Sequence, residues 1–217
     1  MKNIDNIIKL LKQEIKQFEN PIATEIGERT KDPFLILISC ILSLRTKDTT
    51  TGPVSLKLFE VADTPQKLAK IPLKKLQKII KPVNYYITKS KRIKEISKML
   101  IKKYKGKVPD NFEELMKFKG VGRKTAAITM VYGHNKPNFI PVDVHVHVIA
   151  NRLGWVNTKN ADKTMDELMK VVPKRQWYDL NGLFVRLGQN ICITSSPFCS
   201  KCPISKYCPK IGVARSR

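Results

Sequence analysis

The stretch FKGVGRKTAAITM (Phe118–Met130) joins two short helical patterns through the turn Gly120-Val121-Gly122. Two glycines around one apolar residue allow a positive φ and a close approach of another group to the backbone. The amides of the turn and of the next helix's first turn then point the same way and form a site for a phosphate. Gly120, Val121, Gly122 and Arg123 are therefore candidate phosphate-binding residues. The alternative is a plain helix–helix turn with glycine at the C-cap.

Lys124 lies two residues past Gly122, in the first turn of the following helix. The positive end of a helix disfavours a cation, and the neighbouring Arg123 adds to that field. The position therefore favours the neutral amine, which is the nucleophilic form. The alternative is an exposed lysine that contacts a phosphate.

Beyond this turn, apolar residues recur every three or four positions almost everywhere, as one face of a helix requires. The clearest faces are Ile4, Ile7, Ile8, Leu11, Ile15 and Phe18, then Ala161, Met165, Leu168, Met169 and Val172, and then Trp177, Leu180, Leu183, Phe184, Leu187 and Ile191. Prolines, Pro53 among them, stand near the expected starts and stops of helices. Alternation with period two occurs only around Val144, so we expect an all-α fold.

Charge and composition limit the class of protein. The 217 residues include 41 Lys and Arg against 18 Asp and Glu, a net charge of +23, and 42% are hydrophobic. A disordered basic tail is excluded, and a folded body with this charge favours a polyanionic partner. The longest apolar run, Phe34–Leu44, is about half of a membrane span, and the N-terminus does not resemble a secretory signal. We expect an intracellular protein of the cytoplasm or nucleoid with no membrane partner.

The charge is concentrated in one segment. Residues 66–107 contain 15 Lys or Arg and one acid, Glu95. We interpret the segment as a surface that follows a phosphate backbone. For any single lysine, a solvated surface position is the simpler interpretation.

Asp143 stands at the start of another helical pattern, which ends near Gly154. It is an expected N-cap, with its carboxylate bonded to the amides of Val144–Val146. A carboxylate held there stays ionised, so it can also stabilise a cation that develops on a sugar. The nearby His145 and His147 fall on different sides of the helix and are expected to be structural or surface residues.

Four cysteines, Cys192, Cys199, Cys202 and Cys208, form a C-x6-C-x2-C-x5-C pattern. In a reducing compartment they are candidate metal ligands rather than disulfides. Their crowding into one small loop suits a compact iron–sulfur cluster, but the spacing alone leaves structural zinc open. The fifth cysteine, Cys40, lies in an apolar run and is expected to be a buried thiol.

Together these residues resemble the endonuclease III family of helix-hairpin-helix DNA glycosylases. The resemblance runs from about Asp32 to Pro209. Its landmarks are ILSLRTKD (Ile41–Asp48), VPDNFEELMKFKGVGRKTA (Val108–Ala126), VDVHVHVIANRLG (Val142–Gly154) and the four cysteines. Jointly these motifs are specific, whereas the hairpin alone also occurs in DNA-binding proteins that are not enzymes.

The resemblance implies two helical lobes with the DNA cleft between them. Residues 24–136 are expected to form a helical barrel that ends in the helix-hairpin-helix. Residues 1–23 and 137–217 are expected to form the other lobe, with the cluster loop at 192–208. The four cysteines match the family's ligands of a [4Fe–4S] cluster one for one.

The family pattern also assigns roles in catalysis. Lys124, after G-V-G-R, matches the nucleophile, and Asp143, in V-D-x-H, matches its essential partner. The implied enzyme is a bifunctional DNA N-glycosylase and AP lyase, which also cuts at apurinic or apyrimidinic (AP) sites. It would remove damaged, by family default oxidised, pyrimidines through a Schiff base and β-elimination. Its partner would be double-stranded DNA with a damaged base or AP site, bound by a monomer.

The sequence departs from the family pattern at three places. Arg45 stands where bacterial members have the glutamine that fills the gap left by the flipped base, and Lys119 replaces the usual proline before G-V-G. In the loop around Tyr85, a candidate wedge residue, Asn84 replaces a glycine and is expected to take its positive φ. Lys201, in the basic cysteine loop, is a further candidate DNA contact. These departures affect base preference and substrate range.

Two other functions remain open at this point. The first is a monofunctional glycosylase for a mismatched or alkylated base, in which water attacks and Lys124 contacts phosphate. The second is a DNA-binding protein without catalysis. The pairing of Lys124 with Asp143 argues against both.

Overall fold

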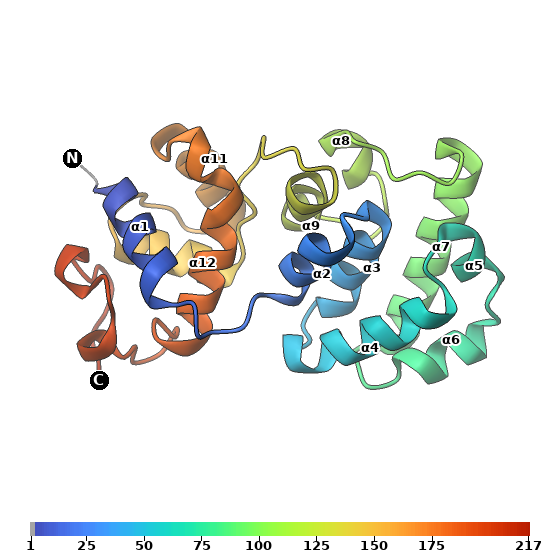
Figure 1. The fold of residues 1–217 in the computed structure, drawn as a ribbon, viewed down its shortest axis with the longest axis horizontal. Coiled ribbons are helices and arrows are strands. Elements are labelled where there is room, and N and C mark those ends of the chain that lie inside the picture. Colours follow the sequence, from blue (N-terminus) through green and yellow to red (C-terminus); the bar gives the residue numbers. More distant parts are fainter. Residues whose placement is uncertain (1–2) are drawn as a thin grey trace. The chain divides into compact units, whose positions relative to one another are not determined.

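The computed structural model describes residues 3–217, and this part of the chain is helical, with no β-strand, as expected. It divides into two compact units. One is continuous, from Ile22 to Lys136; the other combines the chain up to Pro21 with the chain from Pro137 onward. Figure 1 shows the continuous unit as the segment from α2 to α9.

The continuous unit is built around one apolar helix, α3 (Pro33–Ser43). Pro33 occupies the first helical position, and the Asp32 side chain accepts hydrogen bonds from the amides of Phe34 (2.7 Å) and Leu35 (3.4 Å). Proline and a carboxylate cap favour a helix start here. Because α3 is buried on almost every side, other helices must surround it.

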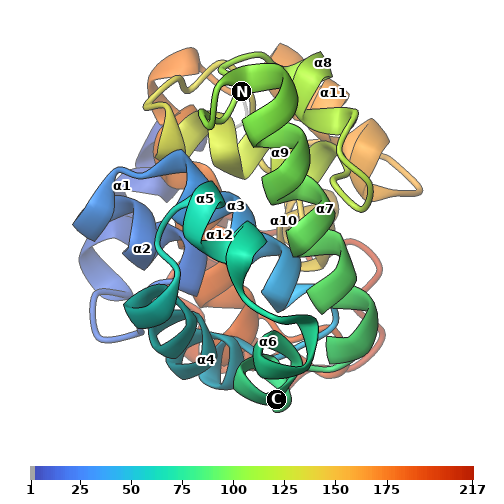
Figure 2. The ribbon, with the colours of Figure 1, turned by 90° about the vertical axis from the view of Figure 1, so that its right-hand side faces the viewer.

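The elements of this unit besides α3 are α2 (Ile22–Thr30), α4 (Asp48–Val61), α5 (Pro65–Lys70), α6 (Leu73–Ile80), α7 (Tyr86–Tyr104), α8 (Phe112–Met116), α9 (Arg123–Ile128) and the π-helical turn η1 (Thr129–Gly133). The helices α2, α4, α7 and α9 and the turn η1 pack on α3, while α5 and α6 pack on α7 (Figure 2).

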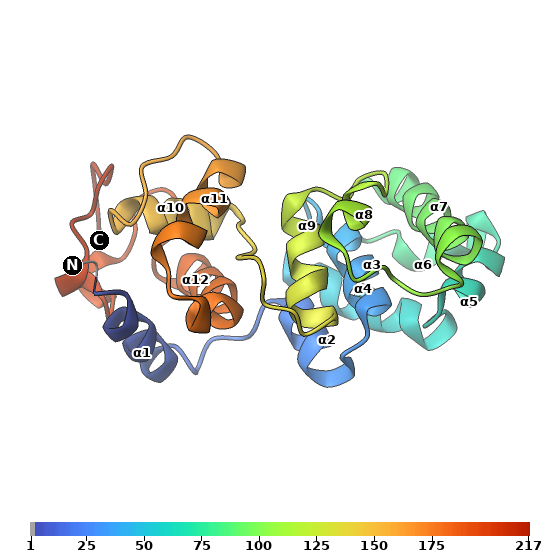
Figure 3. The same ribbon diagram turned by 90° about the horizontal axis from the view of Figure 1, so that it is seen from above.

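The other unit contains α1 (Ile4–Glu14), α10 (Val144–Arg152), α11 (Ala161–Val171), α12 (Trp177–Asn190) and the short 3₁₀ turns η2 (Lys174–Gln176), η3 (Cys199–Lys201) and η4 (Ser205–Tyr207). Helix α10 packs against α11 and α12, and α1 packs against α12 (Figure 3). The chain thus brings its first helix onto its last.

Two expectations about helix limits are wrong. Pro53 lies inside α4 rather than at a helix end. Proline removes only one backbone donor there, and the buried neighbours Thr51 and Val54 hold the helix in place. The first apolar face also ends early, because α1 stops at Glu14 and Phe18 lies beyond it.

Across residues 3–217, none of the helices combines the length and the apolar character that crossing a membrane requires.

Candidate active site

The turn between α8 and α9 needs glycine at only one of its two glycine positions. Gly120 has a φ of +88°, in the left-handed region, which confirms the expected positive φ. Gly122 has a φ of −102° and a ψ of −179°, an extended conformation that any residue adopts. A Cβ built on Gly122 meets no described heavy atom within 4 Å. Val121 between them is buried and anchors the turn.

Lys124 lies in the first turn of α9, as predicted, and its side chain is half-buried. Helix α9 packs on α3, which carries the buried thiol Cys40. Burial raises the pKa of Cys40 to about 12, while the charge of Lys124 acts in the opposite direction. Lys124 therefore interacts electrostatically with a thiol in the interior of its unit.

Asp143 is the N-cap of α10, which confirms the sequence-based expectation of its local role. Its Oδ1 accepts a hydrogen bond from the amide of Val146 at 2.9 Å, and its side chain is half-buried. Val144, directly after it, is exposed. Asp143 lies in the discontinuous unit and Lys124 in the continuous one.

The two candidate DNA-contact side chains Arg45 and Tyr85 are exposed, Tyr85 by 62%. Both have left-handed backbones, with φ of 54° and 58°. The expectation that Asn84 takes the positive φ is therefore wrong, because Tyr85 takes it. Asn84 instead uses its side chain, whose Nδ2 donates to the Arg45 carbonyl at 2.5 Å.

Lys89 is a buried lysine that the sequence reasoning missed. It is only 2% exposed, and burial, with the Arg92 charge adding to it, lowers the pKa of Lys89 to about 8. A signal was present, because Lys89 is in phase with the apolar stripe of Ile93, Ile96 and Leu100 on α7. The dense positive charge of residues 66–107 indicates an exposed surface, so the sequence as a whole predicts that Lys89 is exposed.

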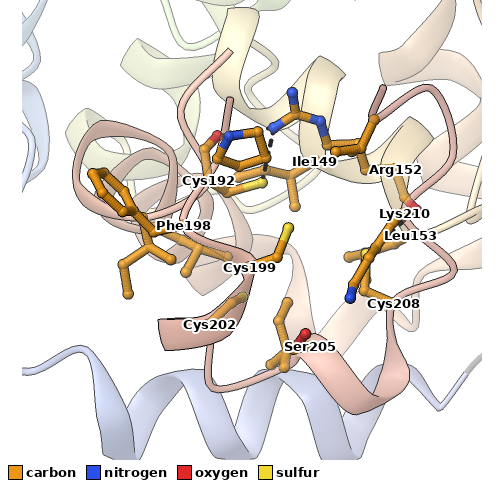
Figure 4. Close-up of a pocket in the computed structure, with 15 residues that line it drawn as sticks. Ile149, Arg152, Leu153, Cys192, Phe198, Cys199, Cys202, Ser205, Cys208 and Lys210 are labelled. Carbon is orange, nitrogen blue, oxygen red and sulfur yellow. Dashed lines mark hydrogen bonds between the residues drawn. The ribbon is translucent and has the colours of Figure 1, made fainter. Parts of the chain in front are cut away.

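The four cysteines Cys192, Cys199, Cys202 and Cys208 line one pocket (Figure 4). Most of the other residues around it are apolar, and Arg152 and Lys210 are its charged members. No acidic side chain occurs among the described residues that line it. The pocket therefore suits an anionic group held by sulfur ligands.

Arg152 holds the entry to the cysteine loop. Its side chain is almost completely buried, and its Nη1 donates to Cys192 Sγ at 3.2 Å (Figure 4). The same Nη1 donates to the Ile193 carbonyl at 2.9 Å. Nη2 donates to the Thr194 carbonyl at 2.6 Å. A buried guanidinium with these bonds stabilises negative charge on the sulfur.

The thiols must lose their protons before they can hold a metal. Burial is the main cause that raises the pKa of Cys192, Cys202 and Cys208, with Cys202 at about 11, so ligation has to displace those protons. Within residues 3–217, no group of three or more His, Cys, Asp or Glu side chains is gathered around a single metal position. Once deprotonated, the four cysteines that line this pocket are the donor set of an iron–sulfur cluster and also of structural zinc.

Lys201, the remaining candidate, is exposed in η3. Its Nζ lies 5.9 Å from the centroid of the Phe198 ring, and the Arg217 guanidinium lies 3.9 Å from the same centroid. The carbonyl of Arg217 also accepts a hydrogen bond from the Ser200 amide at 3.1 Å. The cysteine loop thus has a basic outer surface with a defined conformation.

Comparisons with known proteins identify the family. A family model described as "HhH-GPD superfamily base excision DNA repair protein" matches residues 38–174. The endonuclease III of Thermotoga maritima is 44% identical over 202 residues, which cover 93% of this chain and 92% of that protein. The chain spans about half the length of two chloroplastic endonuclease III homologues of Arabidopsis thaliana, at 35% and 33% identity.

Solved structures of endonuclease III and of a related glycosylase have the same fold as this chain. A non-covalent endonuclease III–DNA complex matches with a TM-score of 0.85 at 30% identity, covering 97% of this chain and 96% of that one. A trapped endonuclease III–DNA covalent intermediate matches with a TM-score of 0.81 at 31% identity, covering 95% and 92%. A thermostable thymine-DNA glycosylase matches with a TM-score of 0.82 at 25% identity, covering 95% and 94%.

The chain therefore belongs to the HhH-GPD superfamily of base excision DNA repair proteins, and the resemblance seen in its motifs is confirmed. Within that superfamily it is an enzyme of the endonuclease III type, a DNA glycosylase and AP lyase.

Proposed function

We propose that Lys124 is the nucleophile and forms the covalent bond to DNA. The observation that carries this proposal is the position of Lys124, half-buried in the first turn of α9 directly behind the Gly120–Gly122 turn. A turn that binds phosphate brings the sugar of a nearby nucleotide within reach of that amine. A related endonuclease III has been trapped as a covalent DNA intermediate, and a covalent bond to DNA requires a nucleophilic group on the protein.

The reaction begins with the neutral amine. The lone pair of Lys124 Nζ forms a bond to the sugar C1′, and the bond from C1′ to the damaged base breaks with its electrons leaving on the base. The proton that Nζ loses passes to the ring oxygen O4′ as the C1′–O4′ bond opens, which leaves a Schiff base. Loss of a proton from C2′ then expels the 3′ phosphate and cuts the strand 3′ to the lesion.

Asp143 is proposed to act on the same sugar as Lys124. Its carboxylate would stabilise the positive charge that develops at C1′ and carry the proton from Nζ to O4′. The N-cap bond to Val146 uses one carboxylate oxygen, Oδ1, and orients the side chain. The cap and the chemistry are therefore compatible.

The damaged nucleotide has to leave the duplex before Lys124 can reach it. We propose that Arg45 and Tyr85 fill the gap, while Arg123 and the turn residues Gly120, Val121 and Gly122 bind phosphate. The surroundings of Gly122 support this proposal. Its backbone is extended, so its conformation does not require glycine, and no described heavy atom lies within 4 Å of its Cβ position. Open space there lets a phosphate approach the backbone.

The four cysteines are proposed to hold a [4Fe–4S] cluster, for which the pocket and the Arg152 bonds are suited. When bound, the cluster would cross-link four points of loop 192–208. It would take no part in base removal. The loop then presents Lys201 to the DNA backbone. In this proposal residues 24–136 form the barrel lobe, and residues 1–23 with 137–217 form the cluster lobe.

The substrate proposed is double-stranded DNA that contains an oxidised pyrimidine or an AP site, bound by a monomer. The likeness to a thymine-DNA glycosylase favours one rival, a mismatch glycosylase in which water attacks C1′. A panel of lesion-bearing duplexes assayed for base release and for nicking separates the two. Release without nicking would support the rival.

Borohydride trapping tests the nucleophile directly. With a duplex that contains thymine glycol or an AP site, the wild-type protein should form a stable covalent adduct, and Lys124→Gln should form none while still binding DNA. Lys117→Gln is the control, because Lys117 is an exposed lysine paired with Glu114 at the end of α8. An undiminished adduct from Lys124→Gln would remove Lys124 from the role.

A further inference from the structure

Lys89 is a buried cation of the continuous unit, and its ammonium group donates hydrogen bonds to the end of α3 and to the segment that follows it. Its Nζ donates to the Leu42 carbonyl at 2.7 Å and to Thr46 Oγ1 at 2.9 Å. Leu42 lies in the last turn of α3, where carbonyls lack helical partners and a cation is favoured. A buried ammonium is costly unless it is hydrogen-bonded in this way. Lys89 therefore binds the segment that follows α3.

The same hydroxyl joins this segment to a second one. Thr46 Oγ1 accepts a hydrogen bond from the Asn84 amide at 3.1 Å as well as from Lys89. The side chain of Asn84 in turn donates to the Arg45 carbonyl. The Arg45 carbonyl and the Thr46 side chain directly after it are thus tied to Asn84, the residue before Tyr85, although some forty residues separate the two segments in the sequence.

Arg45 and Tyr85 both need such support. Each has a left-handed backbone without being glycine, a conformation that persists only when its surroundings impose it. Each also presents an exposed side chain. The direction in which both side chains project therefore depends on the hydrogen bonds that meet at Thr46.

We infer that Lys89 is a positioning residue, whose buried ammonium holds Arg45 and Tyr85 in one fixed arrangement for insertion into the DNA duplex. The inference rests on the proposed function, in which those two side chains contact DNA. Lys89 itself does not touch DNA, because it is buried beneath the segment it supports. Holding the two side chains in advance lowers the ordering cost that binding would otherwise carry.

The variant that tests this is Lys89→Met, which keeps the length of the side chain and removes its donors. The KM for lesion-bearing duplex should rise about tenfold, which corresponds to about 1.4 kcal/mol of binding. The single-turnover rate at saturating DNA should stay within about twofold, because Lys124 and Asp143 are untouched. Thr46→Val removes the shared hydroxyl and should raise KM in the same way if Lys89→Met folds poorly.

Lys94→Met is the matched control. Lys94 is another lysine of α7, and its Nζ donates to the Ala69 carbonyl at 2.8 Å and to the Ile71 carbonyl, at the end of α5. These hydrogen bonds hold α5 rather than residues 42–46 or 84, so their removal should lower the melting temperature without changing KM. An equal rise of KM in Lys94→Met and Lys89→Met would overturn the inference, since it would reflect general destabilisation.

A double-mutant cycle tests the role of Lys89 separately from the proposed DNA contacts of Arg45 and Tyr85. In an Arg45→Ala/Tyr85→Ala background, Lys89→Met should raise KM no further. If that background binds and cleaves like wild type, the proposed DNA contacts are wrong. If the background is impaired but Lys89→Met and Thr46→Val behave like wild type, the contacts stand and Lys89 is not a positioning residue.

Discussion

Gly120 and Gly122 flank the same valine, yet only Gly120 needs glycine for its own backbone. Its φ of +88° is costly for any residue with a Cβ, whereas the extended backbone of Gly122 accepts one. The fold itself sets no requirement for glycine at residue 122, and in the proposed function the open space there admits a phosphate. The C-cap interpretation is wrong, because the C-cap of α8 is Lys117, and the φ of Gly120 belongs to the turn that the Val121 amide closes on the Phe118 carbonyl at 3.0 Å. The phosphate site at Gly122 stays a proposal.

Substituting alanine at each position tests that division. Gly122→Ala should leave the melting temperature unchanged or slightly raised, and weaken binding to duplex DNA about tenfold, because the new methyl group blocks the phosphate. Gly120→Ala should destabilise the fold by about 1–2 kcal/mol. Thermal unfolding and a DNA-binding titration measure both effects. Unchanged DNA affinity in Gly122→Ala would mean that no phosphate approaches this turn.

Asp143 serves as both a helix cap and a proposed catalytic group, and two variants separate these roles. Asparagine is an equally good N-cap, so Asp143→Asn should keep its stability within a few tenths of a kcal/mol, while Asp143→Ala should lose about 1 kcal/mol. Both should lose most of the base-release activity, because neither carries a charge. Denaturant unfolding and single-turnover assays give the two readouts. A fully active Asp143→Asn would show that the carboxylate serves only the helix.

At the level of elements, periodicity predicted the helices well, because an apolar stripe fixes which face is buried. The all-α fold, the cap at Asp143 and the burial of Cys40 are confirmed by the structure. Pro53 was misplaced, since the packing of α4 outweighs the loss of one backbone hydrogen bond. Lys89 was missed for a related reason. A lysine normally indicates solvent, and only the contacts of α7 with the end of α3 show that this one is buried.

The four cysteines of loop 192–208 predict the metal content of the purified protein. Anaerobically purified protein should contain about four iron and four sulfide per chain. Cys199→Ser should lower the iron content and expose the loop around η3 to proteases, because the variant lacks a ligand that ties the loop. Cys40→Ala should keep full iron content, since Cys40 is buried in α3 of the other unit. Zinc at one per chain without iron would contradict the assignment.

For the whole molecule, the net charge of +23 predicts DNA binding that weakens steeply with salt. Lys78, Lys81 and Lys91 are exposed residues on either side of the Tyr85 turn. Replacing all three by Gln should reduce the slope of log K against log salt by about 0.9 for each phosphate that the variant no longer neutralises. The control replaces Lys102, Lys103 and Lys105, at the far end of α7, and should change the slope less. Unchanged slopes in both triple variants would show that residues 66–107 form a solvated surface that does not bind DNA.

The return of the chain's last helix to its first has a consequence for biosynthesis. The apolar face of α1, with Ile7, Ile8 and Leu11, is buried against a partner, α12, that is translated more than 160 residues later. During synthesis, residues 22–136 leave the ribosome before α12 and can fold as a unit. The apolar face of α1 is still exposed at that stage. Until α12 has been made and packs on α1, the apolar face of α1 is open to aggregation and to binding by a chaperone.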